Sequence, residues 1–469
     1  MQTSEVKGKR RHKKDFYAEP DRTLSTAVLF FLATIPILST VAYGAVDIWA
    51  VSFLSIITAV VVILWISEGL KSRQFRFHTS VLQIPILGLI CIAFVQTLPI
   101  GTANLSPELL SIPTVHTLSM DAYATRFFLI RLLIAFIFFA AALAFIDSHK
   151  RISRVALMIV VFGALMAFAG ILQRLASPDA IYGLRPTPQA IPFGPFVNQH
   201  HFAAFMEMTA GLTFGLLFNG ALKRDKNALL GIASVLMGIA ILMTGSRGGF
   251  LSILGVIGFV LAARFFASDN HSDKTADGAT WLGFAAGGAG LLIVIAGAVL
   301  FLGGGGPLFR GLGFQDGQTD ITSGRSHYWE VALKIFFDNP ILGAGFDAFA
   351  VAFGKYDSWN GTFRVEQAHN DYLQTLADAG VLGFICVAAF VFMFFRRGLK
   401  VIRTSSDAMR KSVAIGSMAG CFGILIHSFF DFPLRTQSNL FFFLLLVVLA
   451  TVSAGDDGLG EVQTSANTN

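Results

Sequence analysis

The chain has 469 residues, of which 54% are hydrophobic and only 14% are charged. Soluble domains carry about 25% charged residues, so this composition excludes an ordinary soluble protein and predicts a polytopic membrane protein. The net charge of +6 does not indicate a nucleic-acid partner, because the basic residues fall in short runs between apolar segments rather than in one patch.

About twelve apolar runs are long enough to be membrane helices, which need roughly 20 residues each. The sequence therefore predicts an all-α bundle of about twelve transmembrane helices. The runs lie near residues 24–43, 48–68, 80–99, 122–146, 154–174, 201–220, 228–245, 249–267, 281–303, 379–396, 411–430 and 437–454.

The basic residues predict the orientation of this bundle. Most Lys and Arg residues lie in the amino-terminal segment and in every second connection, which the positive-inside rule places in the cytoplasm. Because the number of spans is even, both termini are expected on that side. We expect residues 1–23 to be a basic tail, 24–455 a single transmembrane domain, and 456–469 a disordered tail.

Two connections on the predicted outer side, near 175–200 and 304–378, are too long for simple turns. The second predicts a helix over 326–337 that ends at Asn339-Pro340, then a glycine turn and a short apolar helix. Connections of this length are usually functional or disordered. The internal helices favour an ordered cap on the outer face.

The most polar stretch beside an apolar run is 366–374. A neutral imidazole at His369 could take a proton from an attacking hydroxyl, with Asn370 and Gln374 nearby. Helical spacing would place Tyr372 on the face of His369. The alternative is a histidine whose hydrogen bonds are satisfied by the loop itself.

Two arginines on the predicted outer side are candidates for binding an anion. Arg247 lies between two apolar runs, where a charge costs at least ~2.5 kcal/mol, and the glycines beside it would let a bulky anion approach. Arg325 begins the predicted loop helix, where free N–H groups and a guanidinium together suit an anion. The alternatives are an arginine that reaches lipid headgroups and a solvated loop charge.

Asn198 and His201 begin the helix that follows the first long connection, where a packing role and a substrate-groove role are both open. His200 and His201 would point about 100° apart on a helix, which makes them a poor metal pair. No other Cys, His or carboxylate spacing predicts a metal site.

Two further groups of charged residues lie on the predicted outer side. For Arg126 and Arg131 we expect structural ion pairs with Asp121, with a lipid phosphate as the alternative. His427, Asp431 and Arg435 gather at the end of the eleventh run, where we expect them to brace a cavity rather than react. Arg435 is also a candidate substrate contact.

These stretches resemble the O-antigen ligase and polymerase family of bacterial membrane glycosyltransferases. The resemblance spans about residues 160–435. The motifs that carry it are Asn198-Gln-His-His-Phe202, Gly245-Ser-Arg-Gly248, Gly324-Arg-Ser-His-Tyr-Trp329, Asn339-Pro-Ile-Leu-Gly-Ala-Gly-Phe346, and His369-Asn-Asp-Tyr-Leu-Gln374 continuing to Ala379-Gly380.

The resemblance implies an inverting, metal-independent glycosyltransferase without a cofactor, whose donor is a glycan on undecaprenyl diphosphate. The functional histidine and the two arginines of the family correspond to His369, Arg247 and Arg325. Two arginines suit the charge that grows on a leaving diphosphate, and the histidine would orient or deprotonate the acceptor. The expected substrate contacts are Asn198, His201, Asn370, Tyr372, Gln374 and Arg435.

Several readings of the function stay open at this stage. The resemblance implies a bacterial inner-membrane protein with a periplasmic active site, in contact with membrane lipid. Its acceptor would be a lipid A–core sugar, as for a ligase, or another glycan, as for a polymerase, and a protein acceptor is not separated from these. A transporter or flippase is the alternative of another class, but transporters often show internal repeats and midplane polar sites. Here no repeat is visible and the polar residues crowd the outer side.

Overall fold

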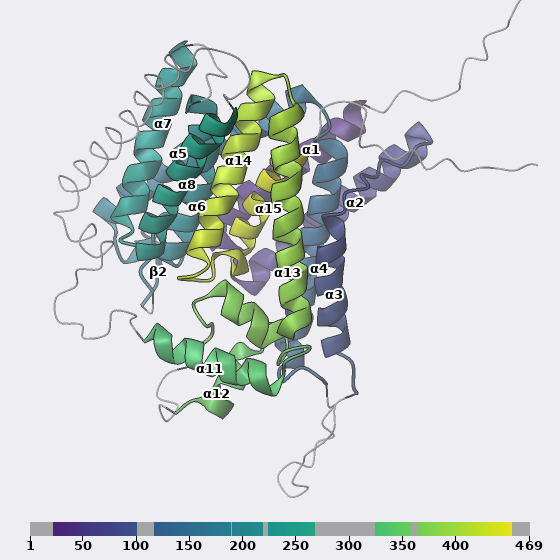
Figure 1. Cartoon of the computed structure of the whole chain (residues 1–469), viewed down its shortest axis with the longest axis vertical. Helices are drawn as coiled ribbons and strands as arrows, with labels where there is room; N and C mark the ends of the chain where they lie inside the picture. The colour runs from purple at the N-terminus through teal and green to yellow at the C-terminus, as the bar shows by residue number, and fades with distance from the viewer. Residues whose placement is uncertain are drawn as a thin grey trace, which may run out of the picture.

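The computed structural model describes residues 22–100, 117–188, 190–218, 224–267, 324–358 and 364–452. These residues form a helical bundle with one β-hairpin of two short strands, shown in Figure 1. The prediction of an all-α membrane protein is confirmed. The predicted run at 281–303, the first part of the 304–378 connection and most of both predicted tails lie outside the described residues.

Nine helices in the described part of the chain are long and apolar enough to cross a membrane. They belong to α1 (Arg22–Val41), α2 (Ile48–Ser72), α4 (Ala122–Phe145), α5 (His149–Ala176), α6 (Gln199–Phe218), α7 (Arg224–Met243), α8 (Arg247–Ala267), α13 (Asp371–Thr404) and α14 (Ala408–His427). The shorter elements are α3 (Gln83–Gln96), α11 (Arg325–Asp338), α12 (Phe349–Tyr356), α15 (Gln437–Thr451), the strands β1 (Ala180–Ile181) and β2 (Arg185–Pro186), and 3-10 turns at Tyr43–Ala45 and Pro433–Arg435.

The predicted count of about twelve spans is not reached in this part of the chain. The runs near 80–99 and 437–454 form α3 and α15, which have 14 and 15 residues. At 1.5 Å per residue each is roughly 21–23 Å long, which is shorter than the ~30 Å hydrocarbon layer. α15 starts late because the 3-10 turn at Pro433–Arg435 precedes it.

Contacts between the connections sort the helix ends into two sets. At one end, Arg76 pairs with Asp147 at 3.3 Å, and His149 Nδ1 lies 3.8 Å from Asp407 Oδ1. At the other end, the segment 427–437 meets the start of α6 and the start of α13. In Figure 1, α11 and α12 lie together beyond this second end. The second end therefore carries an ordered helical cap, as the sequence predicted.

α6 and α14 form a closely packed pair at the centre of the bundle. Gly211 and Gly215 of α6 face Gly420 and Gly416 of α14, and a Cβ on Gly211 or Gly215 would lie 2.5 Å or less from backbone atoms of α14. Small residues four apart on both helices allow this approach, which improves van der Waals packing where lipid offers no hydrophobic driving force. The two helices are thereby held in direct backbone contact.

α13 is broken at Gly380, whose φ of 62° and ψ of −163° are not helical. The turn at 339–345 fills the break: Val381 N donates to Pro340 O at 2.8 Å, and Ala344 N donates to Ala377 O at 2.8 Å. A Cβ on Gly380 would lie 2.4 Å from Ile341 backbone atoms, so only glycine fits. The motif at residues 339–345 and the Ala379-Gly380 motif therefore pack against each other, and we call this contact the interlock at Gly380. It fixes the first turns of α13.

Candidate functional site

His369 lies at the tip of the segment that leads into α13, with a positive φ of 50°. A left-handed conformation is uncommon for a residue with a side chain and costs of order 1–3 kcal/mol. The surrounding hydrogen bonds hold it: Ala368 N donates to Gln374 Oε1 at 2.5 Å, and Asp371 N donates to Ser428 O at 2.9 Å. His369 precedes the helix, so the expectation that it shares a helical face with Tyr372 is wrong.

The imidazole of His369 is held by a carboxylate. Its Nδ1 lies 3.1 Å from Asp431 Oδ1, and the other oxygen of Asp431 faces Arg325 Nη2 at 3.8 Å. The Asp431 side chain is 1% exposed, whereas those of His369 and Arg325 are 29% and 23% exposed. A buried carboxylate thus connects an imidazole and a guanidinium that remain accessible.

The protonation of this pair follows from the environment of Asp431. Burial alone would raise the pKa of Asp431, but the hydrogen bond from His369 and the charges of the neighbouring histidines hold that pKa well below its usual value. An ionised carboxylate only accepts hydrogen bonds, so we assign the proton of His369 to Nδ1. Nε2 is then left with a lone pair that can accept a proton from a substrate.

Arg247 is brought to the same region by the residues on either side of it. Ser246 Oγ lies 2.9 Å from His200 Nδ1, and a Cβ on Gly248 would lie 2.9 Å from the His427 ring. Arg247 is half-buried at the first position of α8. The two adjacent glycines let this helix end lie directly against α6 and α14, which brings the backbone of Arg247 close to His200 and His427.

Asn198 and His201 take part in holding the start of α6. Asn198 Oδ1 accepts the His200 N–H at 2.8 Å, and His201 Nδ1 lies 2.8 Å from Thr436 Oγ1. The rings of His201 and His369 both contact Phe432, each with 4.9 Å between ring centroids. His201 therefore lies one aromatic ring away from His369.

A second His–carboxylate pair lies beneath the first. His427 Nδ1 is 2.8 Å from Glu207 Oε1, and both side chains are at most 1% exposed. Charged groups at membrane depth are expensive unless they are paired. Sequence reasoning missed Glu207, although a carboxylate inside the apolar run 201–220 is the signal that would have revealed it.

Three other predicted contacts use their polar groups within the protein. Asn370 caps α13 by accepting the N–H groups of Tyr372 and Leu373 at 3.0 and 3.1 Å. The Tyr372 hydroxyl donates to Leu425 O at 2.7 Å, and Gln374 Nε2 donates to Asp378 Oδ1 at 3.0 Å. Their substrate-binding roles stay predictions.

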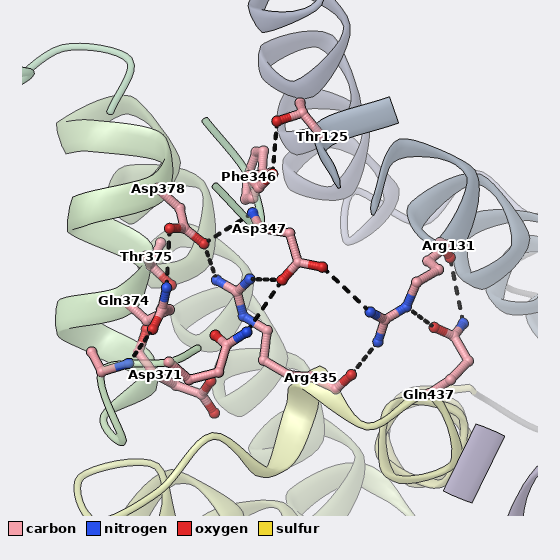
Figure 2. Close-up of polar contacts among 12 residues, drawn as sticks. Thr125, Arg131, Phe346, Asp347, Asp371, Gln374, Thr375, Asp378, Arg435 and Gln437 are labelled. Carbon is pink, nitrogen blue, oxygen red and sulfur yellow. Dashed lines mark hydrogen bonds and ion pairs between the residues drawn. The ribbon is translucent and has the colours of Figure 1, made fainter. Parts of the chain in front are cut away.

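Arg435 belongs to an ion-pair network that lies apart from His369. Figure 2 shows its guanidinium between Asp378 and Asp347, with Nη–Oδ distances of 2.5 and 3.2 Å. Arg131 reaches Asp347 from α4, at 3.8 Å, and donates to the Arg435 carbonyl and to Gln437. Burial would lower the pKa of Arg435, but the carboxylates of Asp378, Asp347 and Asp371 raise it. Arg131 is therefore in a structural ion pair as expected, but its partner is Asp347 and not the predicted Asp121, which caps α4 by accepting the Ala124 N–H. These contacts join the cap to the bundle.

The expectation for Asp431 needs correction. The sequence grouped Asp431 with His427 and Arg435 as bracing residues, but the structure places it directly on His369 and Arg325. The three residues have different partners because the chain turns after α14, so that each points to a different neighbour. In the described ranges, no three His, Cys, Asp or Glu side chains are arranged to hold a metal ion.

A family model described as O-antigen ligase matches residues 232–388. The match supports the resemblance to the O-antigen ligase family that the sequence motifs carry. The matched segment contains Arg247, Arg325 and His369, which the resemblance had singled out, whereas Asp431 lies beyond its end. No curated protein matches the chain.

The match also confirms the coarser parts of the sequence-based reading. The chain is an integral membrane protein, and its ligase-family segment implies lipid-linked glycans as substrates. The matched range lies inside the predicted core of about 160–435, and the wider domain boundaries stay predictions.

Proposed function

We propose that this protein transfers a glycan from undecaprenyl diphosphate to an acceptor hydroxyl at the periplasmic face of the inner membrane, in the manner of an O-antigen ligase. The observation that carries this proposal is the accessible His369 held by the buried Asp431, with Arg325 on the other oxygen of the same carboxylate. Arg247 lies between Ser246, which contacts His200, and Gly248, which packs against the His427 ring. Both termini are cytoplasmic in this proposal.

The reaction breaks the bond between the anomeric carbon and the diphosphate oxygen, and forms a bond from that carbon to the acceptor oxygen. His369 Nε2 takes the acceptor proton, while Asp431 fixes the ring and stabilises the imidazolium that forms. Arg247 and Arg325 stabilise the charge that develops on the leaving undecaprenyl diphosphate. Attack from the side opposite the leaving group inverts the anomeric centre. The residues involved need no cofactor for this chemistry.

The test uses purified protein in proteoliposomes that contain a lipid-linked donor, with mass analysis of the glycan product. We expect Arg247→Ala and Arg325→Ala each to lower kcat by about 10²–10³, the usual cost of removing one charge-stabilising group. Arg185→Ala is the matched control, because Arg185 pairs with Asp47 on a distant connection at 2.6 Å. Full activity in both site variants would refute the proposed roles.

The same assay separates the possible acceptors. Product on lipid A–core indicates a ligase, and long chains made from donor alone indicate a polymerase. Movement of intact donor across the membrane without transfer would favour a flippase instead.

A further inference from the structure

The buried pair of Glu207 and His427 has no part in the chemistry above. Both side chains are at most 1% exposed, and Glu207 Oε1 lies 2.8 Å from His427 Nδ1. Replacing both members of a buried ion pair by apolar side chains often leaves stability unchanged or raises it, so such a pair is weak evidence for a purely stabilising role. The neighbours of the pair indicate what it holds in place.

The pair lies against the first turn of α8. A Cβ on Gly249 would lie 3.3 Å from Glu207 Oε1, and a Cβ on Gly248 would lie 2.9 Å from Cδ2 and 3.1 Å from Nε2 of His427. These two glycines directly follow Arg247. In Figure 1, α6, α8 and α14 pack side by side. α6 and α14 therefore each bring one member of the pair to the same turn of α8.

The residue before Arg247 is held by a separate contact. Ser246 Oγ lies 2.9 Å from His200 Nδ1 and accepts the Gly249 N–H at 3.1 Å. Ser246 is 2% exposed, so this contact also lies in the interior. The backbone is thus held on both sides of Arg247, whose own side chain is only half-buried.

The sequence of this turn makes such contacts necessary. A glycine inside a helix is about 1 kcal/mol less favourable than an alanine, and two of them follow Arg247 directly. The amino end of a helix also carries a partial positive charge, which a nearby carboxylate stabilises by roughly 0.3–1 kcal/mol. The position of Arg247 therefore depends on contacts from α6 and α14 rather than on the helix propensity of its own neighbours.

We propose that Glu207 is a positioning residue for Arg247, acting through His427 and the first turn of α8. The inference rests on the proposed function, which gives Arg247 its part in stabilising the leaving diphosphate. The pair fixes the backbone from which the Arg247 side chain extends. A misplacement of about 1 Å in an active site can cost roughly 10²-fold in rate.

The test is a pair of double-mutant cycles on the single-turnover rate of transfer. Glu207→Ala should lower this rate by up to about 10²-fold, and Glu207→Gln should recover most of it, because the amide keeps a hydrogen bond to His427 Nδ1. In the Arg247→Ala background the loss caused by Glu207→Ala should nearly vanish, because the group that it positions is gone. In the matched Arg325→Ala background the loss should add in full, within about twofold. Equal losses in the two backgrounds would show that Glu207 acts through stability alone.

A second variant covers the case in which Glu207→Ala leaves His427 unpaired and the protein does not fold. Glu207→Leu combined with His427→Leu removes both members of the pair, and apolar replacements of this kind are often tolerated. It should show the same loss of rate when Arg247 is present, and little further loss when Arg247→Ala is added. Unchanged transfer with Arg247 present would overturn the positioning role.

A labelling measurement does not depend on transfer. Addition of Glu207→Ala should change several-fold the rate at which a charged methanethiosulfonate modifies the thiol introduced by Arg247→Cys, and should not change the rate for Arg325→Cys. Peptide masses separate these thiols from Cys91, Cys386 and Cys421. An unchanged rate for Arg247→Cys would contradict the proposal. A changed rate in a protein that transfers no glycan would support the positioning and count against the proposed function.

Discussion

Two clusters of arginine and aspartate at the same end of the bundle differ in how far the protein itself satisfies them. In the bracing network, Arg435 contacts Asp378 and Asp347 at 2.5 and 3.2 Å. At the site, Arg325 lies 3.8 Å from Asp431, beyond hydrogen-bond distance. Asp431 Oδ2 is buried and accepts no hydrogen bond from the described residues. In the first cluster the charged groups are paired within the protein. In the second cluster a carboxylate oxygen can still accept a hydrogen bond from a ligand.

Exposure supports the same distinction. The side chain of Arg435 is 11% exposed, and that of Arg325 is 23% exposed. A charge that is buried and fully paired adds rigidity, since removal of one partner leaves the other uncompensated. A charge that is loosely paired and accessible can exchange its partner for a substrate. The comparison predicts activity losses at one cluster and stability losses at the other.

The largest effect is expected at His369. His369→Ala should lower the transfer rate about 10²–10⁴-fold, because the acceptor hydroxyl loses its base. The measurement is single-turnover transfer in proteoliposomes. The matched control is His327→Ala, which breaks another His–carboxylate pair of the cap, with Asp357 at 2.9 Å. Equal rate losses per folded molecule in the two variants would show that His369 acts through structure alone.

The bracing network should respond in stability. Arg435→Met leaves Asp378 buried without its cation, at a cost of about 3–5 kcal/mol in the free energy of unfolding. A second change, Asp378→Asn, should recover part of that loss because it removes the uncompensated charge. The readout is the thermal unfolding midpoint in detergent, with kcat measured on the folded fraction. A collapse of kcat with unchanged stability would instead favour the substrate contact that the sequence suggested for Arg435.

A pH series sharpens the comparison at Asp431. The pKa of Asp431 is lower in the folded protein than in the unfolded chain, where it lies near 4. The ionised carboxylate therefore stabilises the fold at a pH above the unfolded-state pKa. This stabilisation is lost as the pH falls through the folded-state pKa. The stability gap between wild type and Asp431→Asn should therefore be largest at neutral pH and should shrink below about pH 4. Each unit of lowering corresponds to roughly 1.4 kcal/mol. A gap that does not change with pH would contradict an ionised Asp431.

The smallest effect is expected at the helix cap. Asn370→Ala removes the side chain that accepts the Tyr372 and Leu373 N–H groups, and loss of such a cap costs about 1 kcal/mol. Asn370→Asp should keep the cap and serves as the control. If Asn370→Asp loses transfer while its stability is kept, the Asn370 amide contacts the substrate after all.

The sequence by itself determined the membrane class, the positions of most helices, the ordered helices of the cap and the polar stretches for which we propose a function. Long runs of apolar residues predict membrane helices directly, and a glycine or an Asn-Pro pair predicts a local turn. These features can be predicted without knowing which distant segments they contact. His369, Arg247 and Arg325 were predicted as site residues from such local patterns.

Only the tertiary structure decided which partner each charge has. Asp431 and His369 are 62 positions apart, and His427 and Glu207 are 220 positions apart, so no local pattern relates them. Asp431 and Arg435 are near neighbours in the chain, yet one holds the imidazole and the other joins the cap to α13. The close approach of α6 and α14 at their glycines and the interlock at Gly380 determine these pairings, because a charge in a low-dielectric interior is stabilised by whichever opposite charge the packing brings within reach.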